Sequence, residues 1–459
     1  MSSLNQIKSQ VIKLINNANN TTGKSDTNLT NAQDTLIDGY GEGNDKAIIE
    51  GTLVNFKNDN VSSIKKYCFY NDQTINSVES SSVTSIGSYA FYNCDSLVDI
   101  NMPNLELIKD NAFEECDALT ELNLPSVKNI NDYAFENCDQ LTKVVAPNLE
   151  TCGTQAFYYS RKLEEIDMPK LKTVSGMMTF AATAIKHLYL PSLTTADHGS
   201  FYFCSSLESI DLPLLTTCDL QTFDDCEKLK YINLPVIKTI TRDMFAYANI
   251  EDINGTDVHM PLVNTVGLFS FSRCTNLKTV YFPELTSVSQ GAFQYCSALH
   301  RCEFDKPVSF GYGAFSPCAN LTTFILNNKT LSTLSETNAF SETPIANGTG
   351  YIYVPKDVIE SYKTNTKWST YADSFRAIED WPDVVKGKEV IRHFVMDTTT
   401  SQNNTFDVNY VDNTDGYSLK LDYQYYSQEE EIDSGRLAVV KIKTNDKTII
   451  EEVVVLENG

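Results

Sequence analysis

The chain has few basic residues, few histidines and no long apolar run. Its 36 lysines and arginines stand against 60 aspartates and glutamates, so the net charge is −24. A field of that sign repels phosphate backbones and anionic lipids, which argues against nucleic acid or a membrane surface as a partner. No stretch approaches the roughly 20 apolar residues that span a bilayer, so we expect no membrane insertion.

Residues 1–15 also lack the unbroken apolar stretch of a secretion signal, because polar residues and Lys8 interrupt every apolar pair. We therefore expect either a cytoplasmic protein or one that is assembled inside a cell and then released. Truncation from a longer precursor is a third, less simple alternative.

The sequence offers little of what catalysis needs. None of its five histidines lies in a nucleophile motif, a zinc-binding helix or a glycine-rich phosphate loop. The cysteines form no Cys-x-x-Cys pair, which argues against a metal site. Acidic pairs such as Glu164-Glu165 are typical of a solvated charged surface. We expect no enzymatic activity, no cofactor and no metal.

What the chain does have is a repeat. Phenylalanines recur at a nearly constant interval, and most of the gaps between them are 22 residues. The thirteen repeat phenylalanines are Phe69, Phe91, Phe113, Phe135, Phe157, Phe180, Phe201, Phe223, Phe245, Phe271, Phe293, Phe315 and Phe340. A constant period of roughly 20 to 29 residues indicates a leucine-rich-repeat solenoid, in which stacked coils build a continuous core that no single coil could bury.

Aligned on phenylalanine, the repeats share one template. A small residue precedes Phe, a cysteine and a leucine follow at fixed spacing, and a short strand ends in proline. Residues 111–125 show it with Ala112, Phe113, Cys116, Leu119, Leu122, Leu124 and Pro125. Leucines two positions apart share one face of a strand, and a second extended arm follows. We predict about 13 coils of about 22 residues, each with short strands plus a short helical or 3₁₀ corner.

Two gaps are longer than the rest. The gap between Phe245 and Phe271 contains the extra residues Asn254-Gly255-Thr256-Asp257, which predict an inserted loop. Insertions in solenoids map to loops, so residues 254–260 are a candidate contact.

The cysteines follow the repeat. Eight of the twelve lie three residues after a repeat phenylalanine, as Cys94 and Cys138 do, and Cys152 and Cys218 replace an aliphatic residue of the second arm. These positions indicate core slots filled by a small apolar residue, which is how free cysteine usually behaves. We expect the chain to fold with its cysteines reduced.

Solenoids bind through the outward side chains of their aligned strands. Here the outward columns vary in residue type from coil to coil, unlike a purely structural ladder. Their central part combines aromatic rings with carboxylates, which suits sugars or polar peptide surfaces because rings stack and carboxylates accept hydrogen bonds. The candidate ligand-binding residues are Asp167, His187, Tyr189, Asp211, Tyr231, Asn233 and Tyr281. An ordinary solvated sheet face is the alternative.

The ends of the chain differ from the repeats. Apolar residues at helical spacing over residues 3–18 predict an N-terminal helical docking segment and linker, residues 1–45. The solenoid with its C-terminal cap is expected over residues 46–382. Alternating strands and turn signals predict a small all-β, sandwich-like domain over residues 383–459.

The Ala-Phe-x-x-Cys-x-x-Leu repeats, each with a strand and a proline, resemble the BspA-like leucine-rich-repeat family over roughly residues 60–355. The closing strand from Tyr351 to Pro355 and the segment from Trp368 to Tyr371 also look like the terminal unit of such arrays. The resemblance implies an extracellular or surface protein that binds host or matrix components.

The segment from Leu29 to Gly41 looks like the openings of structural proteins in tailed phages and prophages. Such particles assemble in the reducing cytoplasm and leave by lysis, which would account for free cysteines and the missing signal. Our hypothesis is a non-catalytic virion protein, tail- or capsid-associated, that contacts other virion proteins through residues 1–41 and a host-surface glycan or protein through the solenoid.

Other functions stay open. A bacterial cell-surface adhesin is the first alternative, and localisation would then be the cell surface or the extracellular space instead of the virion. A glycan hydrolase acting through residues 386–459 is the least favoured. The protein could also form a homo-oligomer.

Overall fold

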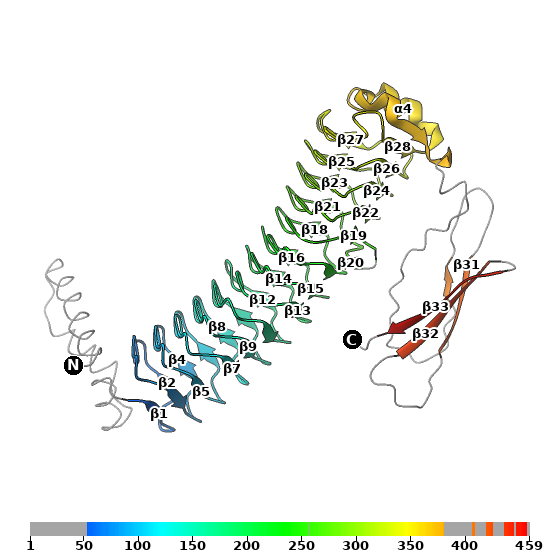
Figure 1. Cartoon of the computed structure of the whole chain (residues 1–459). Coiled ribbons are helices and arrows are strands. Elements are labelled where there is room, and N and C mark those ends of the chain that lie inside the picture. Colours follow the sequence, from blue (N-terminus) through cyan, green and yellow to red (C-terminus); the bar gives the residue numbers. More distant parts are fainter. Residues whose placement is uncertain are drawn as a thin grey trace, which may run out of the picture. The chain divides into compact units, whose positions relative to one another are not determined.

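The computed structural model describes residues 53–255 and 257–380, together with the backbone of four strands between residues 406 and 456. Contacts divide the chain into two units, Met1–Ile391 and Arg392–Gly459, which are drawn in Figure 1. The docking segment expected within residues 1–45 lies outside the described residues.

Residues 53–380 form a parallel β-solenoid of about 15 turns. Each turn contributes one strand to a first-strand row and most contribute another to a second-strand row, and the turns follow one another from blue to yellow in Figure 1. The first-strand row comprises β1 (Asn55–Lys57), β3 (Ser77–Glu79), β5 (Asp99–Asn101), β7 (Glu121–Asn123), β9 (Lys143–Val145), β11 (Glu165–Asp167), β13 (His187–Tyr189), β15 (Ser209–Asp211), β17 (Tyr231–Asn233), β19 (Asp252–Ile253), β20 (Val258–His259), β22 (Thr279–Phe282), β24 (Arg301–Phe304), β26 (Thr323–Leu326), β28 (Tyr351–Val354) and β29 (Phe375–Ala377).

The second-strand row consists of two-residue strands. Its members are β2 (Ser63–Ile64), β4 (Ser85–Ile86), β6 (Leu107–Ile108), β8 (Asn129–Ile130), β10 (Thr151–Cys152), β12 (Thr173–Val174), β14 (Thr195–Ala196), β16 (Thr217–Cys218), β18 (Thr239–Ile240), β21 (Thr265–Val266), β23 (Ser287–Val288), β25 (Ser309–Phe310) and β27 (Thr333–Leu334). The predicted leucine-rich-repeat solenoid is confirmed. The strands β28 and β29 add turns that carry no repeat phenylalanine, which is why the phenylalanine count of thirteen falls short.

Register in both rows follows the repeat. Leu122 of β7 pairs with Val144 of β9, one coil further on, and both strands are parallel. In the first-strand row the central side chain points inward and its neighbours point outward, as Leu188 is buried while His187 and Tyr189 are exposed. A period of two residues requires this alternation.

The corner between the two rows is not the short helix or 3₁₀ segment that we expected. It is a pair of tight turns, in which the residues two positions before and two positions after nearly every repeat phenylalanine adopt the left-handed conformation, as Asn111 and Glu115 do at φ 55° and 59°. Pro317 and Asn338 are the exceptions. The backbone N–H groups of this corner donate hydrogen bonds to the next coil. The N–H of Phe113, for example, donates to the carbonyl of Ala134 at 2.8 Å. Backbone hydrogen bonds between neighbouring coils therefore take the place of the hydrogen bonds that a helix would form within itself.

The repeat phenylalanines form a continuous stack through the solenoid. Successive ring centroids lie 4.9 to 5.7 Å apart and the ring planes are within 20° of parallel. All thirteen side chains are fully buried. Parallel-offset aromatic packing contributes beyond the area that it buries, so each ring ties its coil to both neighbours.

The cysteine slot is buried, as expected, but it is not only a filler. Each of the eight repeat thiols donates to the carbonyl of the phenylalanine one coil earlier, as the Sγ of Cys138 does to Phe113 at 3.2 Å. The hydroxyl of Ser160 makes the same bond to Phe135 at 2.9 Å. In these nine coils the slot holds a small side chain with a donor, which satisfies a buried carbonyl that would be costly to leave unpaired. In one further coil Ala248 fills the slot without a donor.

A cap covers the last full coil. It consists of η1 (Lys356–Val358), α4 (Ile359–Thr364), η2 (Trp368–Ser374), β29 and η3 (Ile378–Asp380). Trp368 and Tyr362 are fully buried, and the indole N–H of Trp368 donates to the carbonyl of Ser332 at 2.7 Å. The aromatic cluster around Trp368 ends the apolar core, as a solenoid requires at its terminal coil.

In the second unit, four strands form an antiparallel sheet in the order β30-β31-β32-β33. Their bounds are Phe406–Val408, Leu419–Tyr425, Arg436–Thr444 and Lys447–Leu456. The sandwich-like fold of residues 383–459 stays a prediction.

Candidate ligand-binding surfaces

The outward side chains of the first-strand row form a surface that we call the first-strand face. It brings five of the seven candidate residues together. Tyr189, Asp211 and Asn233 stand in one column on neighbouring strands, and His187 and Tyr231 stand in the adjacent column on either side of Ser209. The exposed fractions of Tyr189 and Tyr231 are 59% and 49%.

Hydrogen bonds along the columns hold the polar members of this set. The amide of Asn233 donates to the Asp211 carboxylate at 2.8 Å, and His187 Nδ1 lies 2.9 Å from the Ser209 hydroxyl. The ammonium of Lys230 lies 5.4 Å from the centre of the Tyr231 ring. The rings of Tyr189 and Tyr231 therefore stay exposed to a ligand. The polar side chains around them are already oriented by hydrogen bonds.

The remaining two candidates lie on strands that do not pair with β13, β15 or β17. Asp167 is exposed and ends β11, in the adjoining sheet β11-β9-β7. Tyr281 belongs to β22 beyond the insertion, and its hydroxyl donates to Asp305 at 2.7 Å. Asn327 also donates to Asp305, at 2.8 Å, so Tyr281 is part of a separate hydrogen-bonded cluster.

The insertion separates these clusters because it lies within the first-strand row. β20 pairs with β17 before it, whereas β19 pairs with β22 after it. Asn254, at φ 54°, donates from its amide to the carbonyl of Tyr281 at 2.8 Å and accepts from the N–H of Met260 at 2.7 Å. The row is thereby split, and His259 stands next to Asn233 in its column.

Sequence reasoning missed a second surface, which we name the corner ridge. It consists of the side chains two positions before, one position after and two positions after each repeat phenylalanine. Large apolar or aromatic members with exposed fractions above 40% are Tyr67, Phe203, Tyr247 and Tyr295. The left-handed corner residues project these side chains outward. Aligning these three positions along the chain would have shown the tyrosines.

Aromatic contacts run along the corner ridge from coil to coil. The rings of Tyr67 and Tyr89 stack with centroids 5.2 Å apart. Further along, the guanidinium of Arg273 lies between two rings, 5.6 Å from the centre of Tyr247 and 4.6 Å from that of Tyr295. Part of the ridge is thus filled by its own residues.

Two carboxyl groups of the corner ridge have strongly raised pKa values. Burial, together with the nearby Glu114 and Glu115, raises the pKa of Glu136 to about 7. Burial also raises the pKa of Asp224 to about 7, and the neighbouring Asp225 adds to that shift. One Asp224 oxygen accepts from Gln221 at 2.9 Å, and the other is buried without a partner. Both groups are therefore partly protonated at neutral pH.

Neither a metal site nor a membrane span is found in the part of the chain that the structure describes. Across residues 53–255 and 257–380, no three histidine, cysteine, aspartate or glutamate side chains are grouped so that they could hold a metal ion. Among the described helices, none combines the length and apolar character that crossing a membrane requires.

One family model matches the repeats. Its description is "BspA type Leucine rich repeat region (6 copies)", and the matches cover residues 62–186, 153–260 and 238–362. No protein with a curated function shows significant sequence similarity to the chain.

Several solved structures are similar to the chain. A leucine-rich repeat protein from Bacteroides ovatus is 20% identical, with 65% of this chain and 88% of that one covered and a TM-score of 0.44. A leucine rich cell surface protein from Faecalibacterium prausnitzii is also 20% identical, with coverages of 61% and 84% and a TM-score of 0.34. The pneumococcal vaccine antigen PcpA is 15% identical, with coverages of 70% and 82% and a TM-score of 0.33.

Proposed function

The chain belongs to the BspA-type leucine-rich-repeat family, and we propose that it is a non-catalytic recognition protein whose first-strand face binds a glycan or protein on a host surface. Leucine-rich-repeat solenoids generally act as binding proteins, because stacked coils offer an extended, preformed surface. The repeats occupy most of the described residues, so recognition is the function that the architecture favours.

The observation that carries this proposal is the pair of exposed tyrosines, Tyr189 and Tyr231, on one rigid sheet. Tyrosine supplies a large contact area and loses only two side-chain torsions when it is immobilised. The backbone beneath the rings is fixed by parallel pairing of β13, β15 and β17. Asp211 and His187 beside the rings add acceptors and donors for hydroxyl or amide groups.

The test compares binding of the full chain to host cells and matrix preparations before and after the double substitution Tyr189→Ala and Tyr231→Ala. Buried aromatic anchors dominate binding energy, so we expect the apparent affinity to fall more than about tenfold. The matched control is Tyr67→Ala with Phe203→Ala, which removes two exposed rings from the corner ridge. Equal loss in both double variants, or no loss in the first, would contradict the assignment to the first-strand face.

The proposal includes two placements of the protein. The resemblance of residues 29–41 to phage structural proteins supports a virion component that docks through residues 1–41, and membership of the repeat family supports a bacterial surface adhesin. Mass spectrometry of gradient-purified particles and of washed cells from the source culture separates them. Stoichiometric protein in the particles favours the virion, and protein on washed cells with none in particles favours the adhesin.

A further inference from the structure

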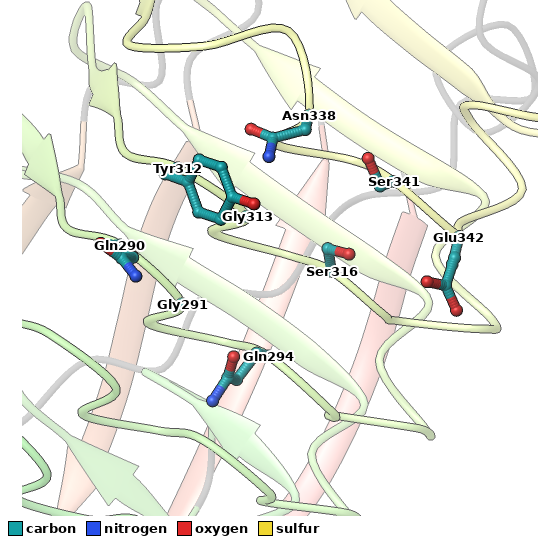
Figure 2. A pocket seen from close by; sticks show the side chains of 9 residues that line it. All are labelled: Gln290, Gly291, Gln294, Tyr312, Gly313, Ser316, Asn338, Ser341 and Glu342. Atoms are coloured by element: carbon teal, nitrogen blue, oxygen red, sulfur yellow. The ribbon is translucent and has the colours of Figure 1, made fainter.

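A hollow of about 230 Å³ lies on the corner ridge near the end of the repeats. Figure 2 shows that its side chains come from three successive corners, with Gln290 and Gln294 on one, Tyr312 on the next, and Asn338 and Ser341 on the last. The hollow is distinct from the first-strand face, which lies on other residues of each coil.

Two glycines create this hollow. The position two residues before the repeat phenylalanine carries a tyrosine at residues 67, 89 and 133, but it is Gly291 and Gly313 here. A Cβ on Gly313 would meet nothing nearer than the Cβ of Ser316 at 3.9 Å, so this side of the hollow is open. A Cβ on Gly291 would lie 2.4 Å from the ring of Phe269, which shows how closely that ring covers Gly291.

The lining is polar and already contains one unmet hydrogen-bonding group. The side-chain oxygen of Asn338 is buried and has no hydrogen-bond partner. Gln290, Gln294 and Ser341 offer further amide and hydroxyl groups, which can both donate and accept. Buried polar groups are nearly always paired, so a molecule enclosed by these groups must bring hydroxyls or amides of its own.

One aromatic side chain, Tyr312, and one charged side chain, Glu342, also line the hollow. The side chain of Tyr312 is 54% exposed and presents a flat apolar face. Glu342 is the only charged residue of the lining, and its carboxylate opposes anionic ligands.

We propose that this hollow is a subsite for one neutral sugar residue of a surface glycan. A sugar ring carries hydroxyls that both donate and accept, as the amides and hydroxyls of the lining require, and an apolar ring face that can pack on Tyr312. The volume is below the 300 Å³ or so at which pockets for drug-sized ligands begin, which suits a single ring. An apolar peptide side chain would desolvate the amides and hydroxyls of the lining without pairing them. The inference deepens the proposed recognition function and rests on it for its biological role.

The experiment uses the full chain and a panel of methyl glycosides of neutral hexoses and N-acetylhexosamines, with sialic acid and a mixed peptide pool as comparisons. Saturation-transfer NMR detects binding, and titration gives relative affinities. Gly313→Tyr fills the hollow with the side chain that other coils carry at this corner position, where Tyr67, Tyr89 and Tyr133 adopt the same left-handed conformation. The matched control is Gly199→Tyr, at the same corner position outside the hollow.

We expect at least one neutral glycoside to bind, Gly313→Tyr to abolish the signal, and Gly199→Tyr to leave it unchanged. A second variant, Asn338→Ala, removes one acceptor and should weaken binding about fivefold to tenfold. Every variant is also measured in the background of Tyr189→Ala with Tyr231→Ala, where the first-strand face has lost its rings, and the outcomes for the subsite are taken from that background. Failure of this subsite and failure of the first-strand face are then told apart. Binding that survives in Gly313→Tyr, a panel without any bound neutral sugar, or a preference for sialic acid or peptides would overturn the proposal.

Discussion

Asp224 makes the stability of the solenoid depend on pH, and Asp224→Asn should remove its share of that dependence. The side chain is 6% exposed, one of its oxygens is buried without a partner, and Asp225 and Asp243 are close enough to repel its charge. Burial and these neighbours raise the pKa of Asp224 to about 7, against about 3.9 in an unfolded chain. The folded protein therefore keeps a proton at pH 5 or 6 that the unfolded chain has lost.

The sign of the effect follows from proton linkage. Between about pH 4 and pH 7 the folded state binds more protons than the unfolded state, so the free energy of unfolding falls as pH rises. The full slope is about 1.4 kcal/mol per pH unit, or about 4 kcal/mol over this window. The corner ridge faces solvent and water screens part of the repulsion, so we expect about half of that, about 2 kcal/mol. Above pH 7 this contribution is lost.

The measurement is urea unfolding followed by circular dichroism at pH 5 and pH 8, with wild type and Asp224→Asn compared at each pH. An asparagine keeps the bond from Gln221 and carries no charge. About two pH units lie between pH 5 and the folded pKa, which is about 2.7 kcal/mol at full slope. With the same halving, we expect the free energy of unfolding of Asp224→Asn relative to wild type to be about 1.3 kcal/mol higher at pH 8 than at pH 5. The control is Asp139→Asn, an exposed aspartate, whose difference from wild type should stay within about 0.5 kcal/mol at both pH values. A difference for Asp224→Asn that does not change between pH 5 and pH 8 would refute the reasoning.

Two further predictions concern the core. Phe157→Ala removes a fully buried ring from the middle of the stack and should cost about 3 to 5 kcal/mol in thermal or urea unfolding, whereas Phe157→Leu should cost clearly less because it refills part of the volume. Similar costs in both variants would mean that ring stacking, which both lose, outweighs side-chain volume. Cys138→Val leaves the carbonyl of Phe113 without its donor and should lower the free energy of unfolding by about 1 to 3 kcal/mol. Cys138→Ser keeps this hydrogen bond, as Ser160 does in its own coil, and should lower it less. The reverse order would show that the thiol acts only as an apolar filler.

The repeat and its core could be predicted from sequence because every coil repeats the same constraint. A phenylalanine every 22 residues has one position in which it can stack on the next ring, and a leucine two residues from another must share its face of the strand. The outward columns follow from the same alternation. The constant register up to β17 is what brings Tyr189, Asp211 and Asn233 into one column.

The insertion and the corner could not be read in the same way. Whether residues 254–260 leave the solenoid or join its strand row depends on which neighbours pair with β19 and β20, and pairing partners are a tertiary property. The corner looked helical because short segments between strands often are. Its left-handed residues, such as Asn111 and Glu115, are set by hydrogen bonds to the next coil, which no local pattern encodes.

The same division explains where recognition can vary. The interior positions of a coil are tied to both neighbours by ring stacking and by the thiol bond, so substitution there disturbs three coils at once. Corner and strand-face side chains contact little beyond their own columns, and they can change without that cost. Specificity should therefore lie where an outward column changes abruptly, as it does when Phe269 gives way to Gly291 and Gly313. At that place the fold is intact and the surface alone has changed, which is what a binding site on a repeat scaffold requires.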